Sequence, residues 1–260
     1  EFSVIDPYII GQIYELFLAE SLVLQEDGHI TAQEKPEVVD SQGAVNTPKN
    51  ITDIIVEETL HPLYDGKTPG ETVQYRIADI CCGSGNFLLS SFEYIVNYHI
   101  EFYRRHDVEN AMRRGDICQR PGSTNFILAY EKKRAIDPLA VEVSKFSLLL
   151  KALENTSLEE VEAFRQRTHK RFLPNLDENI KNGNSLVDMS YARFNRSVYQ
   201  DAALMNKLKM FDWDAAFGNR KFDAIVGNPP YIRVQNMVHY SREEYDFYKS
   251  EDSPYATAQT

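Results

Sequence analysis

The N-terminal part of the chain begins with an apolar, periodic stretch, and a polar one follows it. Apolar residues recur at intervals of three and four from Pro7 to about Leu24, and this spacing predicts an amphipathic helix with Pro7 near its start. Residues 25–42 are polar and lack periodicity, so we expect a loop or a weak hairpin around Asp27 and Gly28.

A second helix is expected from Pro48 to about Leu60. Thr47 suits the N-cap, and Pro48 suits the first helical position because that position needs no N–H donor. We expect its buried stripe to consist of Ile51, Ile54, Ile55 and Leu60. The free N–H groups at its start could also receive a carboxylate. Together with the preceding helix, it predicts an N-terminal helical segment over residues 1–70.

The next apolar run, Tyr75–Ile80, predicts a strand that ends in a glycine turn. Asp79 lies at the end of this strand, and Gly83 and Gly85 permit a tight turn against a ligand. A helix is expected over residues 86–100. A strand, a glycine turn and a helix form the nucleotide-binding half of a doubly wound sheet. An Asp before the turn suits a ligand with a cationic amino group at that end.

A buried parallel strand is expected over residues 222–226, and it leads directly into Asn228-Pro229-Pro230-Tyr231. The prolines lack N–H donors and stiffen the turn, which therefore offers carbonyl oxygens. The Asn228 side-chain oxygen and the Pro229 backbone oxygen can accept both hydrogens of an exocyclic amino group, while Tyr231 stacks on the ring. Two such acceptors localise the lone pair of an aromatic amine. The alternative is a strand stop and a turn without a chemical role.

Most of the remaining sequence predicts helices. Residues 101–125 are charged and irregular, and we expect a helix tail followed by a loop. Asp137 is expected to be the N-cap and Pro138 the first residue of another helix. Further elements are expected over residues 137–153, 157–171 and 194–217 as helices, and over residues 182–187 as a turn with a short strand. Strands that alternate with helices predict an α/β fold.

Composition narrows the class of protein. With 260 residues, of which 43% are apolar and 26% charged, the chain can form a globular protein with one substantial core. Its apolar runs are shorter than the roughly 20 residues of a membrane span, and we expect no signal peptide. Its 3 cysteines form neither a disulfide framework nor a zinc ligand set, so a reducing cytoplasm is the expected setting.

The formal net charge of −11 argues against a protein that holds nucleic acid by bulk electrostatics. Basic clusters that could line a groove occur at residues 104–105, 113–114, 132–134 and 165–171, although such runs are more often solvated faces. If DNA is the substrate, most phosphate contacts are expected on a part outside this sequence.

Five segments together resemble a known family. They are Thr47-Pro48, ADICCGSGNFL at 78–88, IDPLAVEVSKFSLLL at 136–150, GNSL at 183–186 and FDAIVGNPPY at 222–231. In this order they resemble the amino-methylating DNA methyltransferases, most of all the adenine-N6 group of bacterial restriction-modification and phage-defence systems. GQIYELFL at 11–18 is also similar to the segment that precedes the TP motif in the large single-chain, type IIG-like members. The resemblance covers about residues 7–240.

The resemblance implies a Rossmann-like methyltransferase fold, with a central, mostly parallel sheet, helices on both faces and an N-terminal helical segment. Residues 71–260 would form the catalytic domain, without its later strands and without the target-recognition domain. The implied partner is double-stranded DNA with a flipped adenine, and recognition would depend on a domain or subunit outside this chain. No membrane partner is implied.

The resemblance also implies a site, with S-adenosylmethionine as the methyl donor. Thr47 and Pro48 would approach the methionine moiety, and Asp79 would lie near its amino group. The other implied cofactor residues are Cys81, Cys82, Gly83, Gly85, Asn86 and Phe87 along the cofactor, and Asn184 at its adenine ring. The target base would be held by Asn228, Pro229, Pro230 and Tyr231. No metal is implied.

One position departs from the family pattern. The family usually has an apolar strand and then an acidic residue just before IDP, and this acid binds the cofactor ribose. Here Ala135 stands in its place. Three explanations stay open. Either residues 126–130 are the strand and Glu131 is its acid, or residues including the second strand are missing between Arg134 and Ile136, or ribose binding is lost. Asp137 is a further candidate for the ribose contact.

Other functions are compatible with the same motifs. Asn-Pro-Pro-Tyr also serves methyltransferases that act on the glutamine amide of release factors or on guanine N2 of ribosomal RNA. The TP helix and the helix before it favour DNA. A non-catalytic module that binds cofactor or DNA is the third alternative. The missing ribose acid supports that alternative, and the intact set at residues 228–231 argues against it.

Overall fold

The computed structural model describes residues 8–9, 13, 20–25, 28–34, 47–120, 122–129, 138–139, 142–153, 156, 158–168, 176, 179–219, 221–229, 231, 237–239 and 241–256. The chain divides into two compact units. Unit 1 comprises residues 1–14, 46–180 and 221–227, and unit 2 comprises residues 15–45, 181–220 and 228–260. Each unit has its own hydrophobic core. The division into a helical segment and a catalytic domain at residue 70 stays a prediction.

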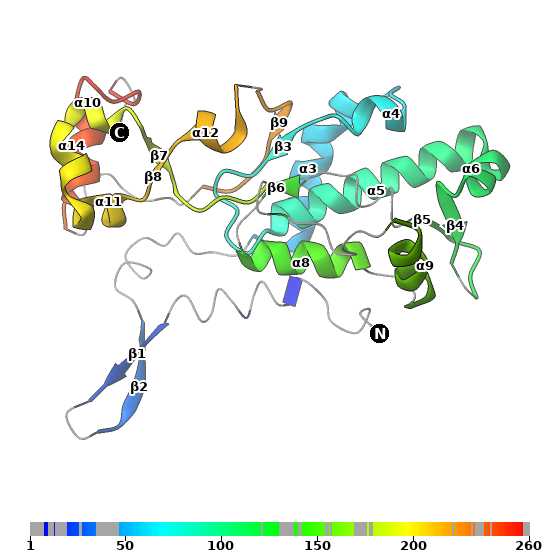
Figure 1. Ribbon diagram of the computed structural model, residues 1–260, viewed down its shortest axis with the longest axis horizontal. Coiled ribbons are helices and arrows are strands. Elements are labelled where there is room, and N and C mark those ends of the chain that lie inside the picture. The colour runs from blue at the N-terminus through cyan, green and yellow to red at the C-terminus, as the bar shows by residue number, and fades with distance from the viewer. Residues whose placement is uncertain are drawn as a thin grey trace. The chain divides into compact units, whose positions relative to one another are not determined.

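The centre of unit 1 is a three-stranded parallel sheet in the order β6, β3, β9 (Figure 1). These strands are β6 (Pro138–Leu139), β3 (Ile77–Ala78) and β9 (Ala224–Ile225). Beyond the ladder, the Val226 N–H donates to the Ala78 carbonyl at 2.9 Å. The sheet therefore joins segments that lie far apart in the sequence, and the carboxyl ends of β3 and β9 lie side by side.

Helices α3 (Lys49–Tyr64) and α8 (Glu142–Leu153) both pack against the long helix α5 (Asn86–His106). Their contacts form most of the core of unit 1, together with Ile77 and Val226 of the sheet region. Tyr64 closes one end of this core, where its ring lies edge to face against Tyr75, Tyr94 and Tyr98, with ring centroids 5.5, 5.7 and 5.2 Å away.

The remaining elements of unit 1 surround this core. They are α4 (Pro69–Thr72), α6 (Val108–Arg114), β4 (Ile117–Gln119), β5 (Phe126–Leu128) and α9 (Leu158–Thr168). Thr68 and Glu71 form a capping box at the start of α4. Strands β4 and β5 form an antiparallel pair. The strand expected near residue 126 is therefore present, but it pairs with β4 and not with β3.

Unit 2 contains short elements around a small core. They are β1 (Glu20–Leu24), β2 (Ile30–Glu34), β7 (Asn184–Asp188), α10 (Tyr191–Phe194), the 3-10 helix η2 (Arg196–Gln200), α11 (Ala202–Leu208), β8 (Met210–Phe211), α12 (Trp213–Phe217) and α14 (Arg242–Lys249). Strands β7 and β8 are parallel. The core consists of Val187, Tyr191, Val198, Leu208 and Phe247.

The predicted α/β class with parallel strands is confirmed, but the described strands form four small sheets and not one central sheet. Strand β9 is also less buried than predicted, because Ile225 is 57% exposed. In the part of the chain that the structure describes, no helix is both long and apolar enough to cross a membrane.

The predicted helix from Pro7 to Leu24 is wrong at its C-terminal end. Tyr8 and Ile9 are helical, but residues 20–24 form β1, which pairs with β2 in an antiparallel hairpin. Gly28, with φ of +83°, forms the turn, and the Gln25 N–H donates to the His29 carbonyl at 2.8 Å. The weak hairpin expected around Gly28 is confirmed, and its first strand takes the last residues of the expected helix.

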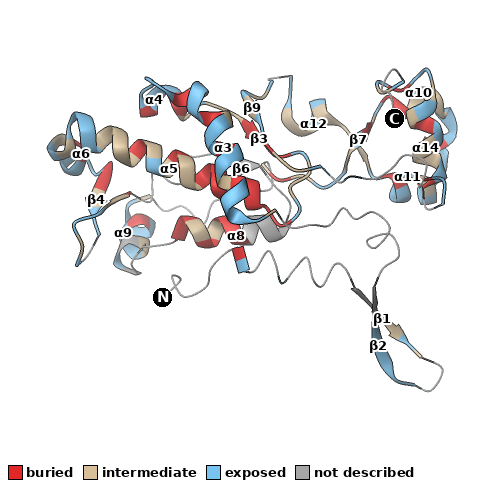
Figure 2. Cartoon of the chain, turned by 180° about the vertical axis from the view of Figure 1, so that it is seen from behind, coloured by how far each residue is buried: buried red, intermediate tan, exposed pale blue. Residues whose placement is uncertain are grey.

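Helix α3 begins one residue later than predicted and buries a different face. Pro48 is its N-cap residue, without a side-chain cap, so Thr47 is not the N-cap. The buried residues are Thr52, Val56, Leu60 and Tyr64, whereas Ile51, Ile54 and Ile55 are exposed (Figure 2). Among the four predicted core residues only Leu60 is buried. The buried face has i, i+4 spacing and packs against α5, and Thr52 fits there because its hydroxyl donates to the Lys49 carbonyl and shares a hydrogen bond with Ser90.

Pro138 does not begin a helix as predicted. Pro138 and Leu139 form β6, parallel to β3, and α8 begins at Glu142. Proline is tolerated there because β6 pairs with β3 alone among the described strands, so an edge position without an N–H donor costs little. Asp137 lies outside the described residues.

Candidate cofactor site

The predicted site residues lie in both units. Unit 1 contains Thr47, Pro48, Asp79, Cys81, Cys82, Gly83, Gly85, Asn86 and Phe87, and unit 2 contains Asn184, Asn228, Pro229 and Tyr231. Pro230 and Glu131 lie outside the described residues. Within unit 1, the glycine turn connects the end of β3 with the start of α5, and a hydrogen bond connects the start of α5 with Thr47, which lies two residues before α3.

Asp79 is a buried carboxylate at the carboxyl end of β3. Its side chain is 9% exposed, and Oδ1 accepts a hydrogen bond from the Cys81 N–H at 3.0 Å. Oδ2 has no hydrogen-bond partner within the part of the chain that the structure describes. Burial raises the pKa of the Asp79 carboxyl from 3.8 to about 6, although hydrogen bonds from the backbone and thiol of Cys81 lower it. An open oxygen of this kind suits a cationic donor.

The turn after Asp79 contains two glycines with positive φ and leads directly into α5. Gly83 and Gly85 have φ of +49° and +88°, a region that residues with a Cβ rarely adopt. The Gly85 N–H donates to the Cys82 carbonyl at 2.6 Å, and Gly85 is the N-cap residue of α5. The tight turn expected from the two glycines is therefore confirmed.

Gly227 brings the end of β9 against this turn. A Cβ on Gly227 would lie 2.7 Å from Asp79 Oδ1 and 3.0 Å from Cys81 Sγ, and the residue has φ of +153°. Only a residue without a side chain allows so close an approach. Gly227 immediately precedes Asn228 in the sequence. The last residue before the candidate target-base loop therefore lies against the candidate cofactor acid.

Replacement of Gly227 with alanine should destabilise the fold by about 1–3 kcal/mol, because the new Cβ must displace Asp79 or Cys81 and the backbone is strained. Urea unfolding measures the effect. Gly115→Ala is the matched control, since Gly115 has φ of +72° but a Cβ there would meet nothing within 4 Å. Equal losses for the two variants would show that the close approach at Gly227 has no energetic consequence.

The residue before Pro48 is linked to the start of α5. Asn86 is buried, and its Nδ2 donates to the Thr47 carbonyl at 3.4 Å. Phe87 is 5% exposed and belongs to the core of unit 1, whereas Pro48 is exposed. Cys81 and Cys82 are half-buried, and neither of them forms a disulfide. These contacts bring the TP motif to the same side of α5 as the glycine turn.

The unit 2 residues have different surroundings. Asn184 uses both ends of its amide: Nδ2 donates to Glu244 Oε2 at 3.1 Å, and Oδ1 accepts from the Leu186 N–H at 3.1 Å. Asn228 is half-buried, Pro229 is exposed, and the Tyr231 ring is 75% exposed. An exposed tyrosine beside a proline turn is available for stacking on a planar ring.

Sequence reasoning identified Asp79 and the glycine turn, but it missed two features of the site. The first is the Cys81 thiol, which hydrogen-bonds to Asp79. The second is the close approach of Gly227, which the sequence analysis used only as the end of a strand. The Gly227 contact depends on two segments that meet in space, so no local pattern in the sequence indicates it. The thiol contact lies within one turn, but the residue types alone do not give the direction of the Cys81 side chain.

Two comparisons relate this chain to known proteins. The family described as Eco57I restriction-modification methylase matches residues 133–259. The "Type II restriction enzyme and methyltransferase RM.Eco57I" of Escherichia coli is 32% identical over 258 residues, which cover 95% of this chain and 23% of that protein. The chain thus spans about a quarter of the length of this relative. No solved structure matches this chain. The chain is therefore related to the methylases of restriction-modification systems, as its motifs indicate.

Proposed function

We propose that this chain contains the catalytic part of a DNA methyltransferase of a restriction-modification system, which transfers a methyl group from S-adenosylmethionine to N6 of adenine. The order of the motifs and the relation to restriction-modification methylases support this function. The parallel sheet of β6, β3 and β9 is compatible with the centre of a Rossmann-like domain.

The observation that supports the proposal most directly is the state of Asp79. Its Oδ2 is buried without a hydrogen-bond partner among the described residues, at the end of a parallel strand and beside a glycine turn. A buried carboxylate oxygen is costly unless a donor, preferably a cation, pairs with it. The ammonium group in the methionine part of S-adenosylmethionine is such a donor, so the residues present fit this cofactor.

When bound, S-adenosylmethionine supplies a methyl group on a positively charged sulfur. In the proposed site, Asp79 holds the ammonium end, and the glycine turn at residues 81–85 lies along the cofactor. Thr47 and Pro48, at the start of α3, lie toward its methionine part, with Asn86 fixing Thr47 in place. Two further parts of the proposal are a residue that binds the cofactor ribose and Asn184 at the adenine ring. No contact among the described residues supports either assignment.

The target adenine is held by the loop after β9 in the proposed mechanism. The Asn228 side-chain oxygen and the Pro229 carbonyl accept the two N6 hydrogens, and the Pro229-Pro230 pair keeps these acceptors rigid. The exposed Tyr231 ring stacks on the base, which has to leave the DNA helix to reach it. The loop thereby orients the amino nitrogen and localises its lone pair for attack.

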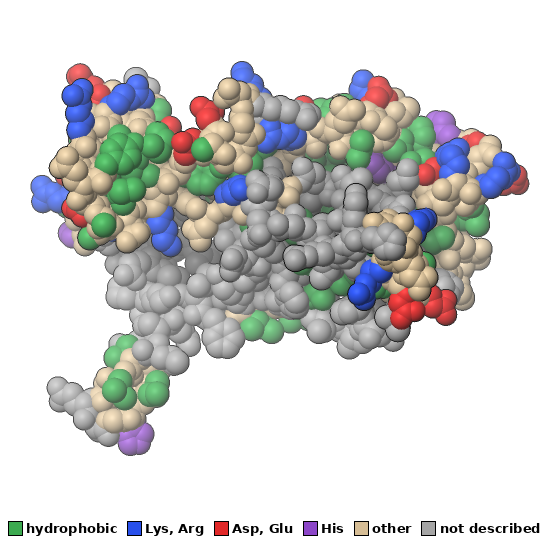
Figure 3. Space-filling model, in the orientation of Figure 1, with side chains coloured by type: hydrophobic (Ala, Val, Ile, Leu, Met, Phe, Trp, Pro, Cys, Tyr) green, Lys and Arg blue, Asp and Glu red, His purple; other side chains and the backbone are tan. Residues whose placement is uncertain are grey.

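The proposed substrate is double-stranded DNA, with sequence recognition by a domain or subunit outside this chain. The distribution of charged side chains agrees with recognition of DNA outside this chain. On the face shown in Figure 3, Lys and Arg side chains lie among Asp and Glu. Arg104 and Arg105 both pair with Glu101, and Arg114 pairs with Asp116. Basic side chains with such acidic partners contribute little to phosphate binding.

The function is tested by identifying the methylated product. The protein is incubated with S-adenosylmethionine labelled in its methyl group and with DNA, RNA or protein acceptors, and the products are digested and separated. We expect label in N6-methyl-2′-deoxyadenosine, from DNA alone. Label in a glutamine side chain, in guanine N2 of RNA or in N4-methylcytosine would replace the proposed acceptor with another one, and no label at all would favour a non-catalytic module.

A further inference from the structure

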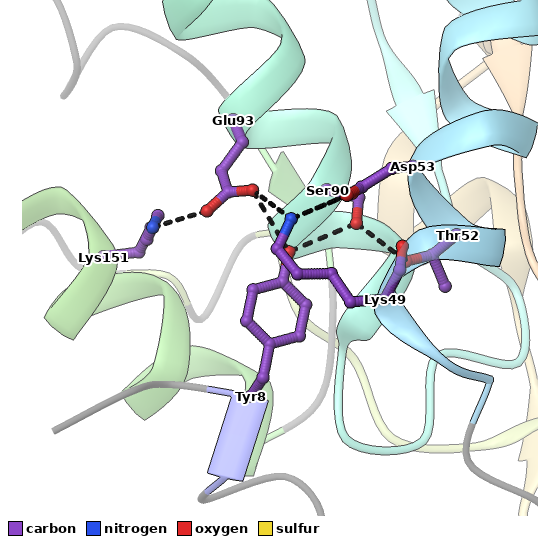
Figure 4. Close-up of polar contacts among 7 residues, drawn as sticks. All are labelled: Tyr8, Lys49, Thr52, Asp53, Ser90, Glu93 and Lys151. Carbon is purple, nitrogen blue, oxygen red and sulfur yellow. Dashed lines mark hydrogen bonds and ion pairs between the residues drawn. The ribbon is translucent and has the colours of Figure 1, made fainter.

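Glu93 of α5 receives contacts from three separate segments of unit 1 (Figure 4). Its carboxylate oxygens lie 2.7 Å from Lys49 Nζ of α3 and 2.5 Å from Lys151 Nζ of α8. The Tyr8 hydroxyl also donates to Glu93, at 3.4 Å. With a side chain that is 21% exposed, Glu93 is the common partner of these three segments.

Lys49 is the link between this cluster and the TP motif, because it follows Pro48 directly. Its ammonium also lies 2.8 Å from Asp53 one turn along α3 and 4.8 Å from the centre of the Tyr8 ring. Burial alone would lower the pKa of Lys49, but hydrogen bonds to Asp53 and Glu93 outweigh it, so the pKa is raised. The ammonium therefore stays charged at neutral pH.

The start of α3 is thus attached to α5 at two levels. Asn86, in the first turn of α5, holds the Thr47 carbonyl, and Glu93, about two turns later, holds Lys49. Between them, the Thr52 and Ser90 hydroxyls share a hydrogen bond of 2.9 Å. Two attachments along one helix fix the direction of α3 as well as its position. They place Thr47 and Pro48 relative to the glycine turn at the start of α5.

We propose that Glu93 is a positioning residue of the cofactor site: its ion pair with Lys49 holds the TP end of α3 against the glycine turn and thereby sets the affinity for S-adenosylmethionine. This inference rests on the function proposed above. Glu93 does not itself contact the cofactor in this arrangement. Its second lysine, Lys151, comes from α8, where none of the proposed site residues lies.

The two lysines give a matched pair of variants. Lys49→Met and Lys151→Met each remove one ion pair from the same carboxylate and keep the aliphatic stem. Lys151 is 17% exposed and Lys49 44%, so a purely structural role predicts that Lys151→Met has the larger effect on every property, unfolding included. If Glu93 is a positioning residue, Lys49→Met has the larger effect on the affinity for the cofactor, and Lys151→Met has the larger effect on unfolding.

The test is calorimetric titration of the wild type and both variants with S-adenosylmethionine, with thermal unfolding as the second measurement. We expect Lys49→Met to raise Kd about fivefold, the effect of one partly exposed ion pair, and Lys151→Met to change it less than about twofold. Lys151→Met should have the lower Tm. In a Glu93→Gln background, Lys49→Met should have a much smaller effect on Kd than in the wild type, because the Lys49–Glu93 ion pair is already absent and only the contacts of Lys49 with Asp53 and Tyr8 remain to be lost.

Each outcome decides the matter. Wild-type protein that binds S-adenosylmethionine, with equal Kd changes for the two lysine variants or with a larger change for Lys151→Met, overturns the positioning role and leaves the proposed function intact. Additive effects of Lys49→Met and Glu93→Gln also overturn it. Wild-type protein that does not bind S-adenosylmethionine overturns the proposed function, and the positioning role with it.

Discussion

Replacement of Asn228 with alanine should abolish methyl transfer and leave the affinity for S-adenosylmethionine within about twofold of the wild type. The variant loses the side-chain oxygen that is proposed to accept one N6 hydrogen, so the amino group is neither oriented nor activated. A loss of one essential acceptor of a reacting group costs about 10²–10³ in turnover, and loss of orientation adds to it. Single-turnover transfer of labelled methyl to DNA measures the rate, and calorimetry measures Kd.

The matched control is Asn219→Ala, an exposed asparagine of the same unit that lies before β9. This control should keep full activity. An Asn228→Ala variant that keeps its turnover would remove Asn228 from the reaction. A variant that loses cofactor binding in the same measure as activity would instead move Asn228 into the cofactor site.

Elements with a local signal were predicted well from the sequence. Helix α5 begins at Asn86, as predicted, because Gly85 with its positive φ ends the turn there. The hairpin turn at Gly28 and the strand β7 also follow from glycine or from a short apolar run. In each case the residues that decide the structure are neighbours in the sequence.

The errors arose where tertiary contacts outweighed local pattern. The isoleucines of α3 form an apolar stripe, yet the helix packs the face of Thr52, Val56, Leu60 and Tyr64 against α5, where the Thr52 hydroxyl finds a partner in Ser90. Pro138 has the position of a first helical residue, yet pairing with Ile77 of β3 makes it part of a strand. A single sequence contains no information on such partners across unit 1.

The same distinction applies to the site. Asp79 is recognisable because it lies between an apolar strand and two glycines. The Gly227 contact and the cluster of Lys49, Glu93 and Lys151 cannot be recognised in this way, because the residues in contact are 44 or more positions apart in the sequence. The residues expected to do chemistry are therefore visible in the sequence, whereas those expected to position them become visible only in the structure.

Asp79→Asn should have opposite effects on stability and on cofactor binding. The Asp79 carboxyl is protonated more easily in the folded protein than in the unfolded one, since its pKa rises from 3.8 to about 6. Its stabilising contribution is therefore full below about pH 3.8 and is lost as the pH rises through 6. At pH 8 the ligand-free protein thus has a buried charge that costs up to about 3 kcal/mol.

The asparagine removes this charge but leaves an amide N–H₂ group that also lacks a partner, so we expect a net gain of about 1 kcal/mol in unfolding free energy at pH 8. The same change removes the negative partner of the cofactor ammonium, and Kd should rise at least about a hundredfold, as when one member of a buried ion pair is lost. Urea unfolding and calorimetry of one preparation measure the two effects.

The pH dependence of binding separates this explanation from a general distortion of the turn. Wild-type affinity should fall as the pH drops from 7 through 6, because protonated Asp79 cannot pair with an ammonium. The residual affinity of Asp79→Asn should show no transition in that range. A wild-type profile that is flat from pH 5 to 8, or a variant with the same transition, would assign the binding of the amino group to another residue.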